Sequence, residues 1–96
     1  MNIFVGEVSC EINDYDYPIM EQYAIGASDS FQGCRNIWEE YKAKILKREE
    51  DEGGNLHSIV VENTDTDLEI NDGIVTTNYH YEIMMCKMNS VFPWLV

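Results

Sequence analysis

One short stretch carries acidic side chains in the alternating order of a calcium-binding loop. Asp65, Asp67 and Glu69 occupy its first, third and fifth positions. Such a loop also needs glycine at its sixth position, for a sharp turn, and a glutamate that binds the ion at its twelfth. Those two positions hold Ile70 and Thr76. The sequence therefore predicts no calcium site here.

Histidine and cysteine are the other side chains that commonly hold metals. Structural zinc sites usually take their ligands in closely spaced pairs. His57 and His80 belong to no such pair, and Cys10, Cys34 and Cys86 are widely separated. We therefore expect no metal and no other cofactor. An odd number of cysteines set in apolar patterns predicts reduced thiols in the core rather than a disulfide framework.

No motif of an enzyme active site occurs in the sequence. A catalytic nucleophile would be marked by a feature such as a glycine-rich elbow, and phosphate chemistry by a glycine-rich loop. The chain has neither, and it has no basic, aromatic-rich stretch of the kind that binds nucleic acid directly. We expect no catalytic residues and a protein that is not an enzyme.

The distribution of charge is the most informative feature of the sequence. The 96 residues include 18 acidic and six basic side chains, which gives a net charge of -12. Residues 1–34 hold six acids and no base (-6), residues 35–48 hold two acids and five bases (+3), and residues 49–96 hold ten acids and one base (-9). Nearly all the positive charge is therefore confined to the middle of the chain.

Length and composition predict one acidic domain that spans residues 1–96. A hydrophobic content of 45% argues against disorder, which the high net charge would otherwise favour. No apolar run approaches the roughly 18 to 20 residues that cross a bilayer, and the N-terminus lacks the basic start of a secretory signal. We expect a cytoplasmic protein that does not insert into membranes.

The longest helical pattern covers residues 28–52. Apolar side chains recur there at helical spacing, at Phe31, Cys34, Trp38, Tyr41 and Ile45. This spacing predicts an amphipathic helix that packs its apolar stripe on another element. Candidate caps at its start and end are Ser28, Asp29, Ser30, Gly53 and Gly54. The same helix carries five of the six bases, namely Arg35, Lys42, Lys44, Lys47 and Arg48.

Strands are predicted on both sides of this helix. Apolar residues alternate along residues 3–12, where Gly6 leaves a gap, and residues 19–27 lead into the helix. After the helix, strands are predicted near residues 56–62 and 68–70 and from residue 75 onward. The last of these places one apolar set on a buried face, at Val75, Thr77, Tyr79, Tyr81, Ile83 and Met85. Thr76, Asn78, His80 and Glu82 then form its wet face.

These elements predict an α+β domain in two layers. Strands joined by short turns favour an antiparallel sheet, here of four to five strands in the order ββαββ, and the amphipathic helix must cover one of its faces.

The charge of the predicted sheet suggests a function. Duplex DNA carries one charge per about 1.7 Å of its axis, and an acidic surface of similar density can enter a groove that binds phosphates. We expect a non-enzymatic protein that blocks a basic, nucleic-acid-binding partner such as a nuclease or defence effector by DNA mimicry. Small acidic inhibitors of this kind, including anti-restriction and anti-CRISPR proteins, are typical of phages.

The candidate contact residues lie in two turn-rich segments. They combine carboxylates with aromatic rings, which are enriched in protein interfaces. The set is Asp14, Tyr15, Asp16, Tyr17, Asp65, Asp67, Glu69 and Asp72.

The alternative is a structural or adaptor domain whose acidity serves only solubility. It would self-associate through an open sheet edge or through the apolar tail at residues 91–96. The sequence leaves open whether the chain is a monomer or a homodimer.

Overall fold

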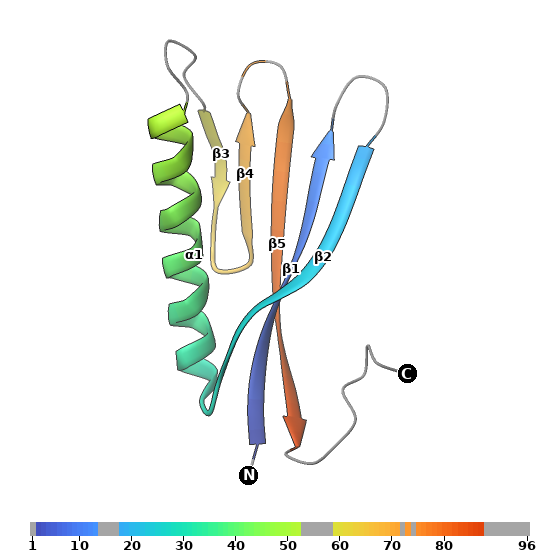
Figure 1. Cartoon of the computed structure of the whole chain (residues 1–96), viewed down its shortest axis with the longest axis vertical. Coiled ribbons are helices and arrows are strands. Elements are labelled where there is room, and N and C mark those ends of the chain that lie inside the picture. The colour runs from blue at the N-terminus through green and yellow to red at the C-terminus, as the bar shows by residue number, and fades with distance from the viewer. Residues whose placement is uncertain (1, 14–17, 53–58, 72, 74, 88–96) are drawn as a thin grey trace.

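The computed structural model describes residues 2–13, 18–52, 59–71, 73 and 75–87. These residues form one helix and five strands (Figure 1). The elements are β1 (Asn2–Asn13), β2 (Pro18–Ser28), α1 (Phe31–Glu52), β3 (Ile59–Asn63), β4 (Asp67–Asn71) and β5 (Thr76–Lys87).

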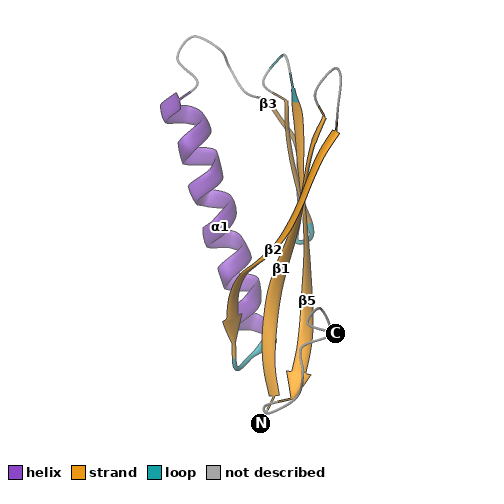
Figure 2. Ribbon diagram, turned by 45° about the vertical axis from the view of Figure 1, so that its right-hand side comes forward, coloured by secondary structure: helices purple, strands orange, loops and turns teal. Residues whose placement is uncertain are grey.

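The predicted α+β architecture is confirmed, with one correction to the order of the elements. All strands belong to one antiparallel sheet in the order β2-β1-β5-β4-β3, and α1 lies on one side of it (Figure 2). The order along the chain is ββαβββ rather than ββαββ. The additional strand, β4, is the one that the sequence pattern placed near residues 68–70, and the turn at residues 64–66 pairs it with β3 as a hairpin.

The first and last strands form the centre of the sheet. β1 pairs with β5 over their full length, from Asn2 opposite Lys87 to Asn13 opposite Thr76. β2 extends the sheet on the β1 side, and the short β3–β4 hairpin extends it on the β5 side. The hairpin reaches only the part of β5 from Thr76 to His80.

The core lies between α1 and the sheet face that bears Val8 and Tyr81. Trp38 is buried in its centre, and its ring stacks on the ring of Tyr81, with centroids 4.8 Å apart and planes at 3°. Gly6 lies beneath Tyr81, since a Cβ atom there would come within 2.0 Å of the Tyr81 hydroxyl oxygen. Gly6, which interrupts the alternation of apolar residues in the sequence, therefore leaves room for the Tyr81 ring.

The predicted helix stripe is confirmed except at its first position. Cys34, Trp38 and Ile45 are buried, and Tyr41 packs against the core. Phe31 is 50% exposed, and only the edge of its ring contacts Phe4. The stripe fails there because Phe31 begins the helix at the rim of the sheet.

The buried face predicted for the last strand is also only partly correct. Tyr79 and Tyr81 are buried, and Ile83 packs against the core. Met85 is 59% exposed. It lies opposite Phe4, at the same rim as the first turn of α1.

The helix starts as predicted, at a serine cap. The Ser30 hydroxyl oxygen accepts a hydrogen bond from the Gly33 amide at 3.0 Å, which satisfies one of the unpaired amides of the first turn. The predicted stop at Gly53 and Gly54 lies outside the described residues.

The three cysteines are free and buried. The Cys34 thiol donates a hydrogen bond to the Phe4 carbonyl at 3.2 Å, and burial raises the pKa of Cys34 and of Cys10. Both thiols are therefore packing groups held in the neutral form, as the sequence pattern predicted.

Candidate acidic interface

The sheet has a second face that α1 does not cover. Residues directly opposite each other on paired strands share a face, and successive residues alternate between faces. Because Val8 and Tyr81 point toward α1, their neighbours Glu7, Ser9 and His80 lie on the other side. We call this the helix-free face.

Acidic side chains are concentrated on the helix-free face. The five strands carry seven acidic residues, and pairing places Glu21 opposite Cys10 on the helix side. The other six share the helix-free face and are defined here as the acid face: Glu7, Glu11, Glu62, Asp67, Glu69 and Glu82. Residues 2–13, 59–63, 67–71 and 76–86 of these strands contain no lysine or arginine.

Two carboxylate pairs on the acid face lie directly across from each other. Glu7 is opposite Glu82 on the central strands, and Glu62 is opposite Glu69 in the hairpin. Side chains in such positions have Cβ atoms about 4.5 to 5.5 Å apart, and like charges there destabilise a sheet. Glu11 extends the row of Glu69 and Glu62, with Asn78 between it and Glu69.

A histidine lies in the middle of the acid face. His80 Nδ1 is 2.9 Å from Asp67 Oδ1, and His80 Nε2 is 3.2 Å from Glu82 Oε1. The hydrogen bond with Asp67 is the main reason that the pKa of His80 is raised above its usual value. The pKa of Asp67 is lowered, first by the hydrogen bond from Thr66 and then by His80. Within the part of the face that the structure describes, His80 is the group that can offset part of the negative charge.

Three of the four remaining carboxylates on the acid face have no internal partner among the described residues. Glu7 accepts a hydrogen bond from the Gln22 side-chain amide. Within the described part of the chain, Glu11, Glu62 and Glu69 form no side-chain hydrogen bond or ion pair. A cationic group can therefore approach these three without displacing an internal contact.

The predicted contact residues fall into three groups. Asp67 and Glu69 lie on the acid face. Asp65 lies in the β3–β4 turn, where it accepts a hydrogen bond from Arg35 at 2.8 Å that lowers its pKa. The others, Asp14, Tyr15, Asp16, Tyr17 and Asp72, lie outside the described residues, and their role stays a prediction.

The two turn-rich segments that contain the predicted contact residues are only partly at the same end of the sheet. Asn13, which precedes residues 14–17, pairs with Thr76, and so does Asn71. The β1–β2 and β4–β5 connections therefore leave the sheet at the same end. Asp65 belongs to the turn at the other end of β4.

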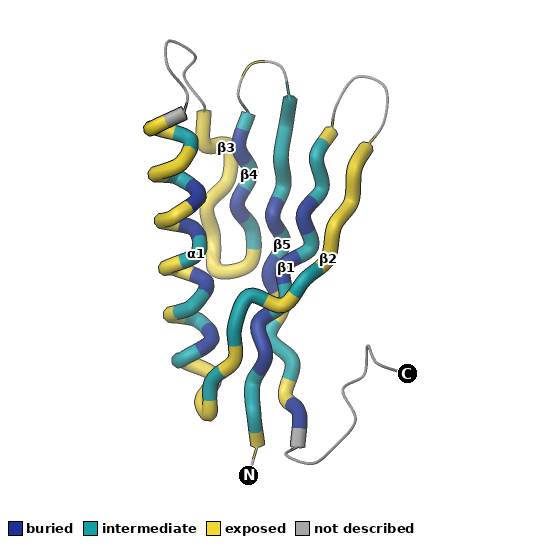
Figure 3. The backbone as a smooth tube through the Cα atoms, viewed as in Figure 1, coloured by how far each residue is buried: buried dark blue, intermediate teal, exposed yellow. Residues whose placement is uncertain are grey.

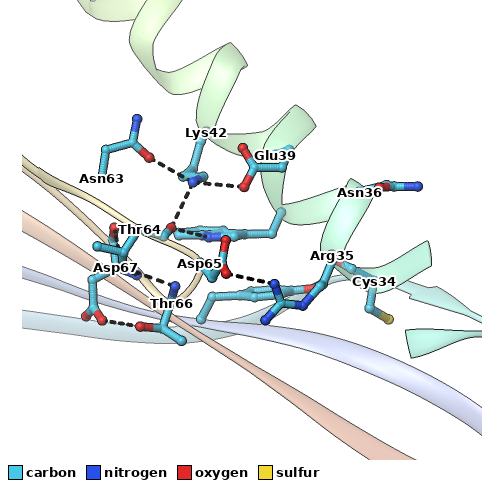
Figure 4. Close-up of polar contacts among 12 residues, drawn as sticks. Cys34, Arg35, Asn36, Glu39, Lys42, Asn63, Thr64, Asp65, Thr66 and Asp67 are labelled. Carbon is cyan, nitrogen blue, oxygen red and sulfur yellow. Dashed lines mark hydrogen bonds and ion pairs between the residues drawn. The ribbon is translucent and has the colours of Figure 1, made fainter. Parts of the chain in front are cut away.

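Helix side chains hold the β3–β4 turn in place (Figure 4). The Thr64 carbonyl accepts hydrogen bonds from Trp38 Nε1 at 3.1 Å and from Lys42 Nζ at 2.8 Å. Lys42 also donates to Asn63 Oδ1 at 2.8 Å, and it is only 4% exposed. Two of the bases in the helix, Arg35 and Lys42, thus stabilise the fold rather than form an open positive surface.

Four carboxylates of the acid face were not among the predicted contacts, namely Glu7, Glu11, Glu62 and Glu82. A signal for Glu82 was present, because strand periodicity placed it with His80 on the wet face of the last strand. The same periodicity puts Glu7 and Glu11 opposite the apolar set of the first strand. What the sequence lacks is the strand order that brings β1, β5, β4 and β3 side by side.

No protein-family model matches the chain, and no similar curated protein or solved structure was found. The helix in the described part of the chain is not apolar enough to span a membrane. Among the described residues, no cluster of three histidine, cysteine, aspartate or glutamate side chains is arranged to hold a metal ion.

Proposed function

We propose that this chain is a small non-enzymatic inhibitor that binds a basic, nucleic-acid-binding protein through the acid face. The observation that carries the proposal is the segregation of charge: six carboxylates share one sheet face on which the described strands place no lysine or arginine. A cationic surface shaped to bind phosphates is the partner whose charge complements such a face.

The like-charge pairs support a binding role over a purely solubilising one. Glu7 opposite Glu82 and Glu62 opposite Glu69 repel each other in the free protein. Sheets can expose a polar face without such pairs, and a face that only confers solubility usually mixes both signs of charge. Lysines and arginines from a partner would turn this repulsion into attraction.

The spacing of the carboxylates is of the same order as that of nucleic-acid charge, though wider. Neighbouring strands lie about 4.8 Å apart, and alternate residues along a strand lie about 6.7 Å apart. A duplex has one phosphate charge per about 3.4 Å of axis on each strand. Charges at these intervals favour contact with a surface that follows a phosphate backbone, such as that of a nuclease or another defence effector.

By its size and charge this chain is analogous to the anti-restriction and anti-CRISPR inhibitors of phages. By that analogy it would bind its basic partner in the cytoplasm, as a monomer. DNA mimicry predicts that duplex DNA and this chain exclude each other from the partner.

The test compares two matched variants that each lose five charges. The first neutralises the acid face at Glu7, Glu11, Glu62, Glu69 and Glu82, each changed to Gln. The control neutralises acids elsewhere, as Asp29→Asn, Glu21→Gln, Glu40→Gln, Glu50→Gln and Asp51→Asn. Immobilised parent protein is expected to capture a nucleic-acid-binding protein from host lysate at low salt and to release it when duplex DNA is added.

Only the acid-face variant should lose this capture, by at least tenfold for several lost contacts, since each rim pair contributes up to about 1 kcal/mol. Equal capture by both variants would refute the acid face as the binding surface. Equal loss in both would mean that total charge, not this face, attracts the protein.

A second candidate is a structural or adaptor domain that self-associates through its open sheet edge. The observation in its favour is β3, whose five residues are all exposed at the outer edge of the sheet (Figure 3). Ile59, Val60 and Val61 are 65%, 45% and 58% exposed. Exposed β-branched residues on an edge strand favour pairing with another chain. Sedimentation over a range of protein concentrations separates this candidate from a monomeric inhibitor.

A further inference from the structure

One half of β5 has an unpaired edge. β1 covers one side of β5 along its whole length, whereas β4 covers the other side only as far as His80. The Tyr81 amide still donates to the Thr66 carbonyl at 2.7 Å, at the end of the hairpin. Beyond it, no described strand pairs with the β4 side of β5 between Glu82 and Lys87.

The unpaired main-chain groups can be assigned from this last hydrogen bond. Along an antiparallel strand, the amides of alternate residues point toward the same neighbour. Because the Tyr81 amide points to the β4 side, those of Ile83 and Met85 point there too. Their amides and carbonyls form a row that can pair with a further strand.

An open hollow of about 340 Å³ lies beside the start of this edge. The helix contributes Phe31 and Arg35 to its lining, β5 contributes Glu82 and Ile83, and the turn contributes Asp65 and Thr66. Phe31 is 50% exposed, its ring makes a T-shaped contact with Phe4, and the Arg35 guanidinium lies 5.4 Å from its centre. The hollow therefore combines an apolar ring, the ion pair of Arg35 with Asp65, the Glu82 carboxylate and a free strand edge.

We propose that this edge receives an extended basic segment of the partner, which adds as a strand beside β5 in line with β4. The inference rests on the proposed function, because it names how the partner of the acid face is held. Strand addition obtains its affinity from main-chain hydrogen bonds and its specificity from alternate side chains. The edge from Glu82 to Lys87 accommodates a segment of about six residues, or about 20 Å.

The two faces of the added strand would contact different kinds of side chain. Side chains that point to the helix side would lie against Phe31 and Ile83, which favours apolar residues. Those that point to the other side would lie beside Glu82 and, one strand further, Glu7. The recognised segment therefore alternates apolar residues with lysine or arginine.

A second copy of this chain is the less suitable occupant of the edge. Each copy carries a net charge of -12, and pairing of two such edges would bring Glu82 of one copy toward the same acidic surface of the other. Like charges at an interface oppose association, whereas a basic strand gains from them.

The test uses a seven-residue peptide that alternates valine and lysine, with a control peptide of the same composition in which the valines and lysines form two blocks. Amide hydrogen exchange of the full chain is followed by NMR with and without each peptide. The alternating peptide is expected to slow exchange of the Ile83 and Met85 amides, and the block peptide is expected to have little effect.

Two variants separate main-chain pairing from side-chain contact. Met85→Pro removes an amide that faces away from β1 and leaves the β1 pairing intact, as proline allows on an edge. Met85→Ala keeps that amide. The proline variant should bind the alternating peptide about tenfold more weakly than the alanine variant, the equivalent of one or two net hydrogen bonds.

Each contrary result has a distinct meaning. Peptide binding that shifts acid-face resonances without protecting Ile83 and Met85 would overturn the strand addition and leave the proposed function standing. Failure to bind either peptide would also overturn it, and the capture experiment would still test the acid face alone. Protection that grows with protein concentration and needs no peptide would show that a second copy fills the edge. If Met85→Pro does not fold, exchange in the parent chain decides the question.

Discussion

Trp38 joins three parts of the molecule through a single side chain. Its ring stacks on Tyr81 of β5, and its indole N–H donates to the Thr64 carbonyl in the β3–β4 turn. The Lys42 ammonium lies 5.3 Å from the centre of the same ring. Because the ring is only 1% exposed, each of these contacts is made away from water. Trp38 is therefore the side chain on which the docking of α1 most depends.

The first prediction is that Trp38→Ala destabilises the protein by about 3 to 5 kcal/mol, the usual result of removing a large buried ring. The measurement is urea unfolding followed by circular dichroism. Phe31→Ala is the control, and its smaller effect should follow from its 50% exposure. Similar losses for both variants would show that helix docking does not centre on Trp38.

The β3–β4 hairpin depends on the helix as much as on the sheet. Its turn accepts hydrogen bonds from Trp38 and Lys42, and Asp65 pairs with Arg35. The hairpin pairs with β5 along only five residues, from Asn71 opposite Thr76 to Asp67 opposite His80. Such a short strand pair is weak alone, so the helix contacts supply much of what holds it.

The second prediction concerns Lys42, whose side chain is 5% exposed. Lys42→Met keeps most of the aliphatic stem and leaves Asn63 Oδ1 without its donor. The expected cost is about 1 to 3 kcal/mol, because methionine cannot replace the charge-assisted hydrogen bonds that Lys42 donates to Asn63 and to the Thr64 carbonyl. Lys44→Met is the matched control, because Lys44 is 77% exposed and pairs only with Glu40. Its effect should stay within about 0.5 kcal/mol.

Amide exchange locates the effect of Lys42→Met. Faster exchange should appear first in β3 and β4, where the hydrogen bonds of the turn are lost. Uniform acceleration across β1 and β2 would instead indicate that Lys42 supports the whole fold and not the hairpin.

Periodicity predicted the elements well because it depends on local rules. The alternation along residues 3–12 and from residue 75 onward placed the buried and wet sides of β1 and β5 correctly over most of their length. The same rules gave the N-terminal cap of α1 at Ser30. Each of these depends on residues close in sequence.

The remaining features depend on contacts between segments that are distant in the sequence, and local periodicity in one sequence does not predict such contacts. No local pattern predicted the burial of Lys42, which comes from the turn at residues 63–64. Strand order assembled the acid face from four strands, two of which, β1 and β5, lie near opposite ends of the chain. Two of the six carboxylates of the acid face, Asp67 and Glu69, were predicted contacts, and the assembly of the face was not predicted.

At the scale of the whole molecule, repulsion between the carboxylates of the acid face destabilises the folded state. The acid face concentrates six carboxylates, and among the described side chains on that face His80 alone can become cationic. Protonation of His80 adds a positive charge between Asp67 and Glu82. The molecule should therefore respond to small changes of pH near neutrality.

The third prediction is that stability rises as the pH falls from 7.5 to 6. Because folding raises the pKa of His80, the stabilisation is complete below its unfolded pKa of about 6.5 and is lost as the pH rises through the folded value. Below about pH 4 the stability should instead fall as the pH falls, because folding lowers the pKa of Asp67 and protonating this carboxyl therefore costs stability.

Thermal unfolding between pH 5 and 8 tests this dependence. In His80→Gln the rise toward pH 6 should shrink markedly, since this variant lacks the imidazole whose pKa is raised by folding. A parent protein whose melting temperature declines steadily from pH 7.5 to 6 would contradict the prediction.

The pairing of the first strand with the last has a consequence for how the protein is made. Asn2 lies opposite Lys87, so the central pair of the sheet joins residues separated by most of the chain. Contacts of such long sequence separation form slowly, because nearly the whole chain must be enclosed as a loop. A ribosome that has released residues 2–71 has produced two hairpins and a helix but no sheet to unite them. Assembly of this sheet must therefore wait until β5 has emerged and can pair with β1.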